Sequence, residues 1–380
     1  MRGSRVAALL AVVLVLGTAA CAGPGTSTQP TASQVGASQP ATSSSLPDAS
    51  AKCQDPLGNT ASPADDIQLS PDEIAKVRAG NYKAAVLWAG SGIWYEAADK
   101  GAAKAFEELG IQRVATADAN YDTAKQKTDV ETAMALDPDV VLGNPVDPVA
   151  AADAFRPVVT KGMGLVLTDV IPQGFTPGKE YSAFVAGNRC QSGAIMADLM
   201  AEAIGGSGKI GMIFYDADFF ATNILDSNFK KVIQEKYPDI EIAAEQGFAT
   251  EAGTQGVAEA MLAQHPDLKG IYVSWSVAAQ GVIAALRAAG SDIKVVTHDL
   301  DAVNDVDMAK GRNLYGVAAE HVYDIGYRMG MAAGYSLLGK ELPPFNTVQM
   351  MKVTKDNLVD AWNVVYNTDP PDAVKQALQP

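Results

Sequence analysis

The sequence predicts an α/β protein of two lobes, each a doubly wound and mostly parallel sheet, joined by a hinge of several chain crossings. Ten short runs rich in Val, Ile, Leu and Ala alternate with stretches whose apolar residues recur at helical spacing. Nearly continuous apolar strands are typical of parallel sheets covered by helices on both faces. The expected strands are 84–89, 113–116, 139–143, 164–168, 183–186, 209–215, 240–245, 270–275, 293–297 and 315–318.

Two sheets are expected instead of one because ten strands in a single twisted sheet are uncommon. The alternation also pauses after residue 184 and resumes at Lys209, which places a lobe boundary near residue 185. Later crossings of the chain between the lobes would form a hinge beside a cleft. The expected N-terminal lobe is 82–186 with 321–345, and the expected C-terminal lobe is 187–320 with 346–380.

The start of the chain has the pattern of an export signal. Arg2 and Arg5 precede an apolar run, residues 6–16, that is too short to span a bilayer. The quartet TAAC that ends at Cys21 resembles a bacterial lipobox, with Thr in the place where Leu is more usual. We therefore expect a lipoprotein signal peptide at 1–20 and lipidation of Cys21 as the first residue of the mature protein. The alternative is ordinary secretory cleavage, in which Cys21 has no role.

The segment after the signal peptide is expected to be a tether. Residues 21–51 are almost entirely small and polar, so they bury too little apolar surface to fold and predict disorder. Residues 52–81 are interpreted as a linker that leads into the first strand. A lipid at the far end of such a tether would hold a folded body at the outer face of the cell membrane.

Cys53 and Cys190 are the two cysteines that remain once Cys21 is assigned. Export to an oxidising compartment permits a disulfide between them. Their distance along the chain leaves open the alternative of two unconnected buried thiols.

The net charge and the histidines exclude several kinds of partner. A formal net charge of -15 argues against nucleic acid and against an anionic membrane surface as direct partners, so the only membrane contact expected is the lipid anchor. The three histidines, His265, His298 and His321, do not have the close spacing of a metal site, and no metal is expected.

Two glycine motifs that could indicate an enzyme are incomplete. Gly90-Ser91-Gly92 begins like a dinucleotide fingerprint, but Tyr95 stands at the third glycine position. Gly208-Lys209 resembles the end of a phosphate loop, but Ile210 replaces the Ser or Thr that would hold Mg²⁺. We therefore expect no cofactor and no enzymatic activity.

Hydrogen-bonding and aromatic residues stand where several expected strands end. Trp94 and Tyr95 follow the first strand, Asp169 and Asp299 follow two others, and Trp275 ends a fourth. Ligands bind at the carboxyl ends of strands in open α/β sheets, and ring faces beside carboxylate oxygens suit a polyhydroxylated ligand. Taken singly, each Asp has the alternative of capping the following helix.

Short motifs along the chain occur in an order and spacing that together are specific. They are Trp94-Tyr95 ahead of Gly101, 144–147 (NPVD), 168–169 (TD), 187–188 (GN), 278–281 (AAQG), 298–299 (HD), and 319–320 (AE) ahead of 324–326 (DIG). Through them, from about residue 82 to residue 345, the chain resembles the ribose-binding-protein group of ABC-importer sugar-binding proteins, in its lipoprotein form. The resemblance implies the type I periplasmic binding fold, in which two lobes close on a ligand.

The resemblance also implies which residues bind the ligand. In that group the aromatic pair sandwiches a sugar ring, and the Asn of the N-P-x-D segment contacts it. Two Asp residues after strands bond the hydroxyls, and a residue at the last crossover, usually Gln, adds a contact. The corresponding residues here are Trp94, Tyr95, Asn144, Asp169, Asp299 and Glu320.

Departures from the family pattern bear on the chemistry of the ligand. Val170 stands where these proteins often have Arg, and the helix after Tyr215 presents Asn223 where Arg is frequent. Trp275 with Ser276 replaces a common Asn-Asp pair and adds an aromatic contact. An anionic ligand would meet carboxylates without basic partners, which is costly in a buried site. We therefore expect a neutral sugar or polyol, with an amine-bearing ligand as an alternative.

The expected function is that of a lipid-anchored, monomeric substrate-binding protein of an ABC importer. It would deliver its ligand to a membrane permease that works with an ATPase. The alternative is a receptor of the same fold, whose closed form is read by a signalling kinase or whose ligand is an autoinducer. The export signal and the lack of a DNA-binding head exclude a transcription repressor of related fold.

Overall fold

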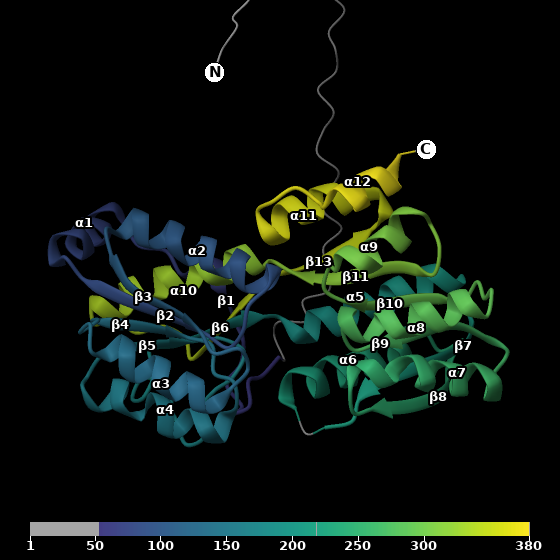
Figure 1. Ribbon diagram of the computed structural model, residues 1–380, viewed down its shortest axis with the longest axis horizontal. Coiled ribbons are helices and arrows are strands. Elements are labelled where there is room, and N and C mark those ends of the chain that lie inside the picture. Colours follow the sequence, from purple (N-terminus) through teal and green to yellow (C-terminus); the bar gives the residue numbers. More distant parts are fainter. Residues whose placement is uncertain (1–52, 218, 380) are drawn as a thin grey trace, which may run out of the picture. The chain divides into compact units, whose positions relative to one another are not determined.

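The computed structural model describes residues 53–217 and 219–379, which form an α/β body with two mostly parallel sheets (Figure 1). The expected fold class is therefore confirmed. The signal peptide, Cys21 and the tether expected at 21–51 lie outside the described residues. Within the described part of the chain, no helix is both long and apolar enough to cross a bilayer.

Seven strands form the first sheet, and every neighbouring pair in it is parallel. Their hydrogen-bonded order is β1 (Ser62–Pro63), β12 (Phe345–Val348), β6 (Ala183–Gly187), β5 (Gly164–Leu167), β4 (Val140–Gly143), β2 (Lys83–Trp88) and β3 (Gln112–Asp118). The second sheet has six strands, and in it only the pair of β13 with β11 is antiparallel. Their order is β13 (Met350–Thr354), β11 (Leu314–Glu320), β10 (Lys294–His298), β9 (Leu268–Val273), β7 (Gly208–Tyr215) and β8 (Ile240–Phe248).

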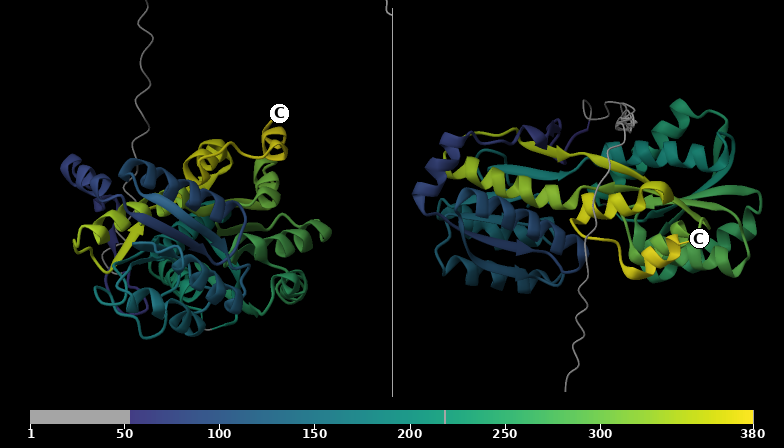
Figure 2. Two further views of the ribbon diagram at one scale, coloured as in Figure 1. Left: turned by 60° about the vertical axis from the view of Figure 1, so that its left-hand side comes forward. Right: turned by 90° about the horizontal axis from the view of Figure 1, so that it is seen from above.

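Helices cover both faces of each sheet. The helices are α1 (Pro71–Gly80), α2 (Ile93–Leu109), α3 (Thr123–Met134), α4 (Pro148–Thr160), α5 (Arg189–Ile204), α6 (Phe220–Lys236), α7 (Thr254–Gln264), α8 (Ser276–Ala288), α9 (Ala302–Ala309), α10 (Val322–Leu337), α11 (Leu358–Tyr366) and α12 (Asp372–Leu378). On the first sheet α2 and α10 lie side by side on one face, and α3 and α4 cover the other (Figures 1 and 2). On the second sheet α5 and α6 pack against one face, and α7 and α8 against the other.

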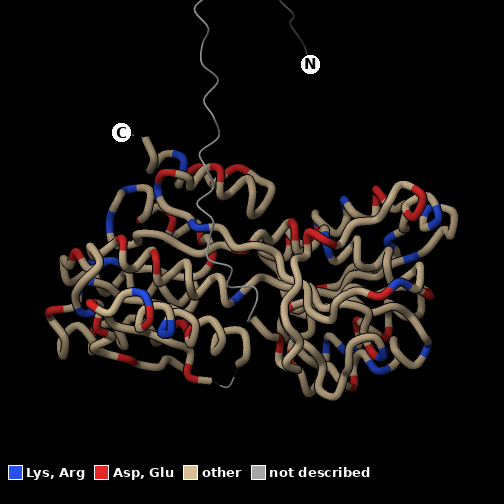
Figure 3. The backbone as a smooth tube through the Cα atoms, turned by 180° about the vertical axis from the view of Figure 1, so that it is seen from behind, with Lys and Arg blue, Asp and Glu red and all other residues tan. Residues whose placement is uncertain are grey.

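Alternation along single strands explains this layering. In β2, Val86 and Trp88 belong to the core shared with α2, whereas Ala85 and Leu87 belong to the core shared with α3 and α4. Successive side chains of a strand point to opposite faces, so a strand that is apolar throughout supplies both cores. The charged residues are interspersed over both sheets and their helices, without one acidic or basic region (Figure 3).

The chain passes between the two sheets three times within the described residues. The crossings are β6 to α5, β11 to α10, and β12 to β13. The backbone N–H of Asn188, on the first crossing, donates to the carbonyl of Val348 on the third at 3.1 Å. The N–H of Met350, also on the third, donates to Oε1 of Gln191 in α5 at 2.8 Å. The first and third crossings are therefore bonded to each other.

All ten expected strands are present, and the differences lie elsewhere in the chain. The segment 52–81, interpreted above as a linker, is folded in its described part: β1 pairs with β12, and α1 begins with a capping box between Ser70 and Glu73. β12 and β13 were not expected, because their polar side chains interrupt the apolar pattern and only pairing with distant strands makes them strands.

Cys53 and Cys190 form a disulfide in the structure, with an S–S distance of 2.05 Å and a Cα–Cα distance of 5.7 Å. Both side chains are buried. The bridge joins the start of the described chain to the first turn of α5, next to the first crossing.

A buried carboxyl links α9 to α11. Asp305 is fully buried, and its Oδ2 accepts a hydrogen bond from Trp362 Nε1 at 2.9 Å, while Oδ1 has no hydrogen-bond partner among the described residues. Helix α11 also packs against α2 and α10 of the first sheet. Burial raises the pKa of the Asp305 carboxyl to about 8, although the bond from Trp362 opposes the shift.

The raised pKa of Asp305 predicts a specific pH dependence of stability. The folded state holds this proton up to about pH 8, whereas the unfolded chain loses it near the usual value of 3.8. Its stabilisation is therefore complete below about pH 4 and is lost as the pH rises to about 8. In urea unfolding between pH 5 and 8, the free energy of unfolding should fall by up to about 1.4 kcal/mol per pH unit more steeply than in Asp305→Asn. Parallel profiles for the two proteins would contradict the assignment.

Candidate ligand-binding site

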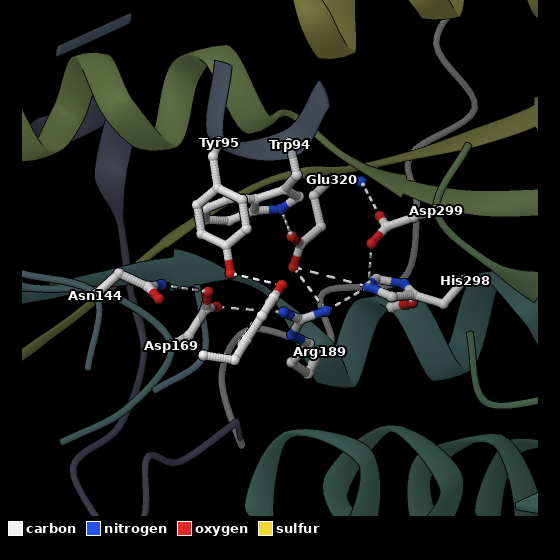
Figure 4. Close-up of polar contacts among 10 residues, drawn as sticks. Trp94, Tyr95, Asn144, Asp169, Arg189, His298, Asp299 and Glu320 are labelled. Atoms are coloured by element: carbon white, nitrogen blue, oxygen red, sulfur yellow. Dashed lines mark hydrogen bonds and ion pairs between the residues drawn. The ribbon is translucent and has the colours of Figure 1, made fainter. Parts of the chain in front are cut away.

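The candidate site lies where strands of both sheets end (Figure 4). Trp94 and Tyr95 occupy the first turn of α2, directly after β2. Asp169 follows β5 of the first sheet, Asp299 follows β10 of the second, and Glu320 is the last residue of β11. The structure thus brings together residues that are far apart in the sequence and that the sequence analysis selected.

Aromatic rings form one wall of the site. The ring centroids of Trp94 and Tyr95 lie 5.1 Å apart, and Trp88 packs edge-on against Trp94 from the strand below. Tyr95 also donates a hydrogen bond to the hydroxyl of the exposed Tyr121 at 3.0 Å. Gly90 permits this arrangement, because a Cβ at that position would overlap the Tyr121 ring. The sequence analysis did not select Tyr121.

Asn144 and Asp169 are held together by a hydrogen bond from Asn144 Nδ2 to Asp169 Oδ2 at 2.9 Å. Asn144 is buried, and its carbonyl accepts from Gln126 Nε2 at 2.9 Å. Gln126 Oε1 in turn accepts from the N–H of Val146 at 3.0 Å. A buried glutamine of α3 therefore fixes the loop that aims Asn144 at Asp169.

Asp169 and Asp299 do not cap helices. Asp169 is followed in the chain by strand β6, and the N-cap of α9 is Asp301. Both carboxylate residues have left-handed backbone, with φ of 57° and 67°, a conformation that Asp tolerates better than most residues. Asp299 Oδ1 accepts a hydrogen bond from the N–H of Glu320 at 3.2 Å, which links the ends of β10 and β11.

An arginine that the sequence analysis did not select lies among these carboxylates. Arg189 Nη1 is 2.8 Å from Glu320 Oε1, and Nη2 is 3.3 Å from Asp169 Oδ1. The guanidinium also forms a short hydrogen bond with His298 Nε2, so it lies between Asp169 and His298 (Figure 4). Its position directly after the Gly187-Asn188 motif at a strand end was the available signal. The family pattern had directed attention to other positions for the basic group.

Glu320 is fully buried behind the aromatic wall. Its Oε2 accepts from Trp94 Nε1 at 3.0 Å, and its Oε1 pairs with Arg189. The carboxyl lies against Gly187 at the end of β6, where a Cβ would overlap Oε1. Close approach between the first and second crossings therefore requires glycine at position 187.

His298 is neutral in this environment. Its pKa is lowered well below the usual value, first by burial and then by the positive charge of Arg189. Its Nδ1 is 2.8 Å from Ser192 Oγ in α5. In the neutral ring Nε2 accepts the bond from Arg189 while Nδ1–H donates to Ser192, so the imidazole supports the guanidinium without adding charge.

Burial and the guanidinium of Arg189 shift the pKa values of the two innermost carboxyls, Asp299 and Glu320, in opposite directions. Burial raises the pKa of Asp299 well above its usual value and also raises that of Glu320. Repulsion by Glu320 raises the pKa of Asp299 further, and repulsion by Asp169 raises both. The positive charge of Arg189 lowers both values. The ionised forms in this site therefore depend on Arg189.

His298, Asp299 and Glu320 each offer one potential metal-ligand atom, and these atoms lie within 4.8 Å of one another. This group was not expected from the sequence, because the three histidines do not lie close together along the chain. The guanidinium of Arg189 already contacts two of its three members, so positive charge is supplied there by the protein itself.

Two other expected site residues lie elsewhere on the second sheet. Trp275 packs against Tyr215 and Phe248, and its Nε1 donates to Glu251 Oε1 at 2.7 Å. Asn223 lies in the first turn of α6, after β7. They belong to the same strand-end edge of the second sheet but not to the cluster around Arg189.

The fold and this site define a binding protein of the periplasmic type. Residues 84–341 match the family described as periplasmic binding protein domain. The chain belongs to this family, which confirms the expected family and the expectation of a binding protein instead of an enzyme.

Individual relatives are named as sugar-binding proteins of importers. A ribose import binding protein of Bacillus subtilis is 28% identical over 247 residues, which cover 64% of this chain and 77% of that protein. A D-apiose import binding protein of Actinobacillus succinogenes is 27% identical over 236 residues, covering 61% and 74%. A solved ABC transporter solute-binding protein from Agrobacterium vitis, bound with α-D-tagatopyranose, has a TM-score of 0.65 and 22% identity, over 75% of this chain and 99% of that chain.

The contact between Gly187 and Glu320 yields a prediction about stability. Gly187→Ala should lower the free energy of unfolding by about 1–3 kcal/mol, because the new methyl group displaces Glu320 from Trp94 and Arg189. The shorter side chain of Glu320→Asp should recover part of this loss in the double variant. Denaturant unfolding of the single and double variants measures both effects.

Gly256 in α7 is a matched control for this prediction, because nothing lies within 4 Å of a Cβ there. Gly256→Ala should leave stability unchanged or slightly raised. If Gly187→Ala changed the free energy of unfolding no more than Gly256→Ala does, the close contact between Gly187 and Glu320 would be contradicted.

Proposed function

We propose that the protein captures a neutral sugar or polyol outside the cytoplasm and delivers it to an ABC permease that works with an ATPase. The observation that carries the proposal is a set of oxygen acceptors beside aromatic rings at the strand ends of both sheets. Trp94 and Tyr95 offer ring faces for C–H surfaces, and Asn144, Asp169 and Asp299 offer acceptors for hydroxyl groups. Glu320 is fully buried, so we assign it the role of holding Trp94 and Arg189 instead of touching the ligand.

The balance of donors and acceptors favours a ligand rich in hydroxyl groups. Carboxylates only accept hydrogen bonds, so a ligand that completes this site has to donate. A polyol can donate to several of these carboxylate and amide oxygens at once through its separate hydroxyl groups.

A basic group does face the carboxylates, contrary to the expectation from the sequence, because Arg189 pairs with Asp169 and Glu320. An anionic ligand is still disfavoured, because the guanidinium is already shared by Glu320 and Asp169. An anion would add to a cluster in which carboxylates outnumber the single guanidinium.

The names of the relatives favour uptake over sensing as the role of this chain. Two curated relatives are import binding proteins, for ribose and for D-apiose. We propose that the protein acts as a monomer of two lobes, one built on the sheet of β1 to β6 with β12 and the other on the sheet of β7 to β11 with β13. The boundary expected after residue 345 is corrected in this respect, because β12 (Phe345–Val348) pairs with β6 of the first sheet. Because acceptors come from both sheets, ligand would stabilise the arrangement in which the two halves meet.

A thermal-shift panel followed by calorimetry tests the proposed ligand class. The probes are D-ribose, D-arabinose, D-glucose, myo-inositol, D-sorbitol and two sugar acids. A ligand at 100 times its dissociation constant adds about 2.7 kcal/mol of stability, which moves a melting midpoint measurably. Binding of a sugar acid in place of neutral probes would contradict the proposal, as would turnover of any probe.

Asp299→Ala should weaken binding of the neutral ligand about ten- to a hundredfold, because a hydrogen bond to a charged acceptor is lost. Asp137→Ala is the matched control, since Asp137 also has left-handed backbone, with φ of 53°, but is exposed at the end of α3. Calorimetric titration of both variants separates loss of the acceptor from backbone strain. Equal affinities in the two variants would remove Asp299 from the site.

We also propose that a lipid on Cys21 anchors the protein at the outer face of the cell membrane. Cells grown with a labelled fatty acid should incorporate the label into the wild-type protein and not into Cys21→Ser. A variant that lacks both Cys53 and Cys190 should keep the label. An unlabelled wild-type protein would favour ordinary secretory cleavage.

A further inference from the structure

We infer that Arg189 sets the charge preference of the site, so that the protein selects an uncharged polyol over its aminated counterpart. The inference rests on the proposed function and concerns a residue that acts on the ligand through the carboxylates. Arg189 is in this sense a positioning and specificity-determining residue.

The charges around Arg189 carry the inference. Asp169, Asp299 and Glu320 supply three carboxyls, and Glu320 is fully buried. Among the ion pairs of the described residues, those that join an arginine or lysine to these carboxyls all come from Arg189. His298, the other basic side chain in contact, is neutral. Without the guanidinium the cluster would therefore contain carboxyls and no cation.

The backbone around Arg189 is fixed at several points, and its guanidinium is held by Glu320, Asp169 and His298 before a ligand arrives. Asn188 caps α5, with its side chain accepting from the N–H of Gln191 at 3.0 Å. The next residue, Cys190, is bonded to Cys53. The N–H of Asn188 is bonded to Val348 on the third crossing. A cation placed in this way compensates the carboxylates at no further ordering cost when ligand binds.

An ammonium group on the ligand would compete with this internal cation. It would pair with the Asp169 oxygen that Arg189 already pairs, and it would add a positive charge beside the guanidinium. A hydroxyl group meets no such repulsion. If Arg189 is replaced by an uncharged residue, the same carboxylates become an attractive site for an ammonium group.

The experiment compares matched pairs of probes by calorimetry at pH 6.5, with the full chain in its disulfide-bonded form. The pairs are D-glucose and D-glucosamine, D-galactose and D-galactosamine, D-ribose and its 2-amino-2-deoxy form, and D-sorbitol and its 1-amino-1-deoxy form. The wild-type protein should bind the neutral member of at least one pair, and bind it at least about tenfold tighter than the amine. Arg189→Met should remove or reverse that preference by at least about tenfold, which is about 1.4 kcal/mol.

A pH profile separates this role from a merely structural one. In the wild-type protein the affinity for the neutral probe should depend less on pH between 5.5 and 8 than in Arg189→Met, because the charge of Arg189 lowers the pKa of Asp299 and of Glu320 against the effect of burial. In Arg189→Met the affinity should rise as the pH falls, because protonation then replaces the lost cation. Arg189→Lys keeps the charge and should keep the weaker pH dependence of the wild type.

Further variants keep the inference testable even if Arg189→Met fails to fold. Glu320→Gln alone leaves the cluster more positive and should strengthen the preference for the neutral probe. In the double variant Arg189→Met with Glu320→Gln, both charges of the pair are gone, and the neutral preference should return. Arg287→Met is the matched control, because Arg287 pairs with the fully buried Asp307 away from the site, and wild-type binding is expected.

The outcomes distinguish failure of the inference from failure of the proposed function. If the wild-type protein binds a neutral probe and Arg189→Met keeps the same preference and the same pH profile as the wild type, Arg189 does not set the charge preference. Suppose that Arg189→Met weakens binding of the neutral and the aminated probe equally at every pH, and that adding Glu320→Gln to it does not restore binding. Arg189 then has another role, and the inference is likewise overturned. A wild-type protein that prefers the amine overturns the inference but leaves a sugar-binding site. If the wild-type protein binds none of the probes, the proposed function is overturned and the inference with it.

Discussion

The buried ion pair between Arg189 and Glu320 is the interaction on which the candidate site depends. It joins the first crossing of the chain between the sheets to the second, and Glu320 carries the contact onward to Trp94 in α2. Two charges in a buried place are costly unless additional bonds satisfy them, and here His298, Asp169 and Trp94 supply those bonds. The same ion pair therefore compensates the buried charges, holds Trp94 of the aromatic wall and connects the two sheets.

This unit suits recognition of a ligand without chemistry on it. The acceptors are oriented by the protein itself: Gln126 fixes the loop of Asn144, Asn144 holds Asp169, and the backbone of Glu320 holds Asp299. Such preorganisation lowers the ordering cost of binding. Asp169 and Glu320 pair with Arg189, and His298 is neutral, which is an arrangement for selecting a ligand by its hydrogen-bonding pattern.

The sequence predicted the strands of both sheets and the residues at their ends well, because apolar runs and strand termini are local features. It could predict that Asp169 and Asp299 lie at the same kind of edge, since parallel strands place their carboxyl ends together. Arg189, Gln126 and β12 could not be predicted in this way. Their roles come from contacts with distant segments, which one sequence read by itself does not specify. For Arg189 the sequence offered only its position after Gly187-Asn188 at a strand end, and not its partners. The mistaken linker at 52–81 has the same cause, because β1 is a strand only through its pairing with β12.

The disulfide between Cys53 and Cys190 determines which part of the fold bears a force applied to the chain that precedes Cys53. Cys53 is the first described residue, and the strand that follows it, β1, has only two residues and lies at the edge of its sheet. A pull on the preceding chain is therefore not borne by the few backbone bonds of β1. It passes through a covalent bridge to the first turn of α5, a helix that packs against β9, β10 and β11. A load applied through the preceding chain would thus be carried by the core of the second sheet, and it would not separate β1 from the edge of the first sheet.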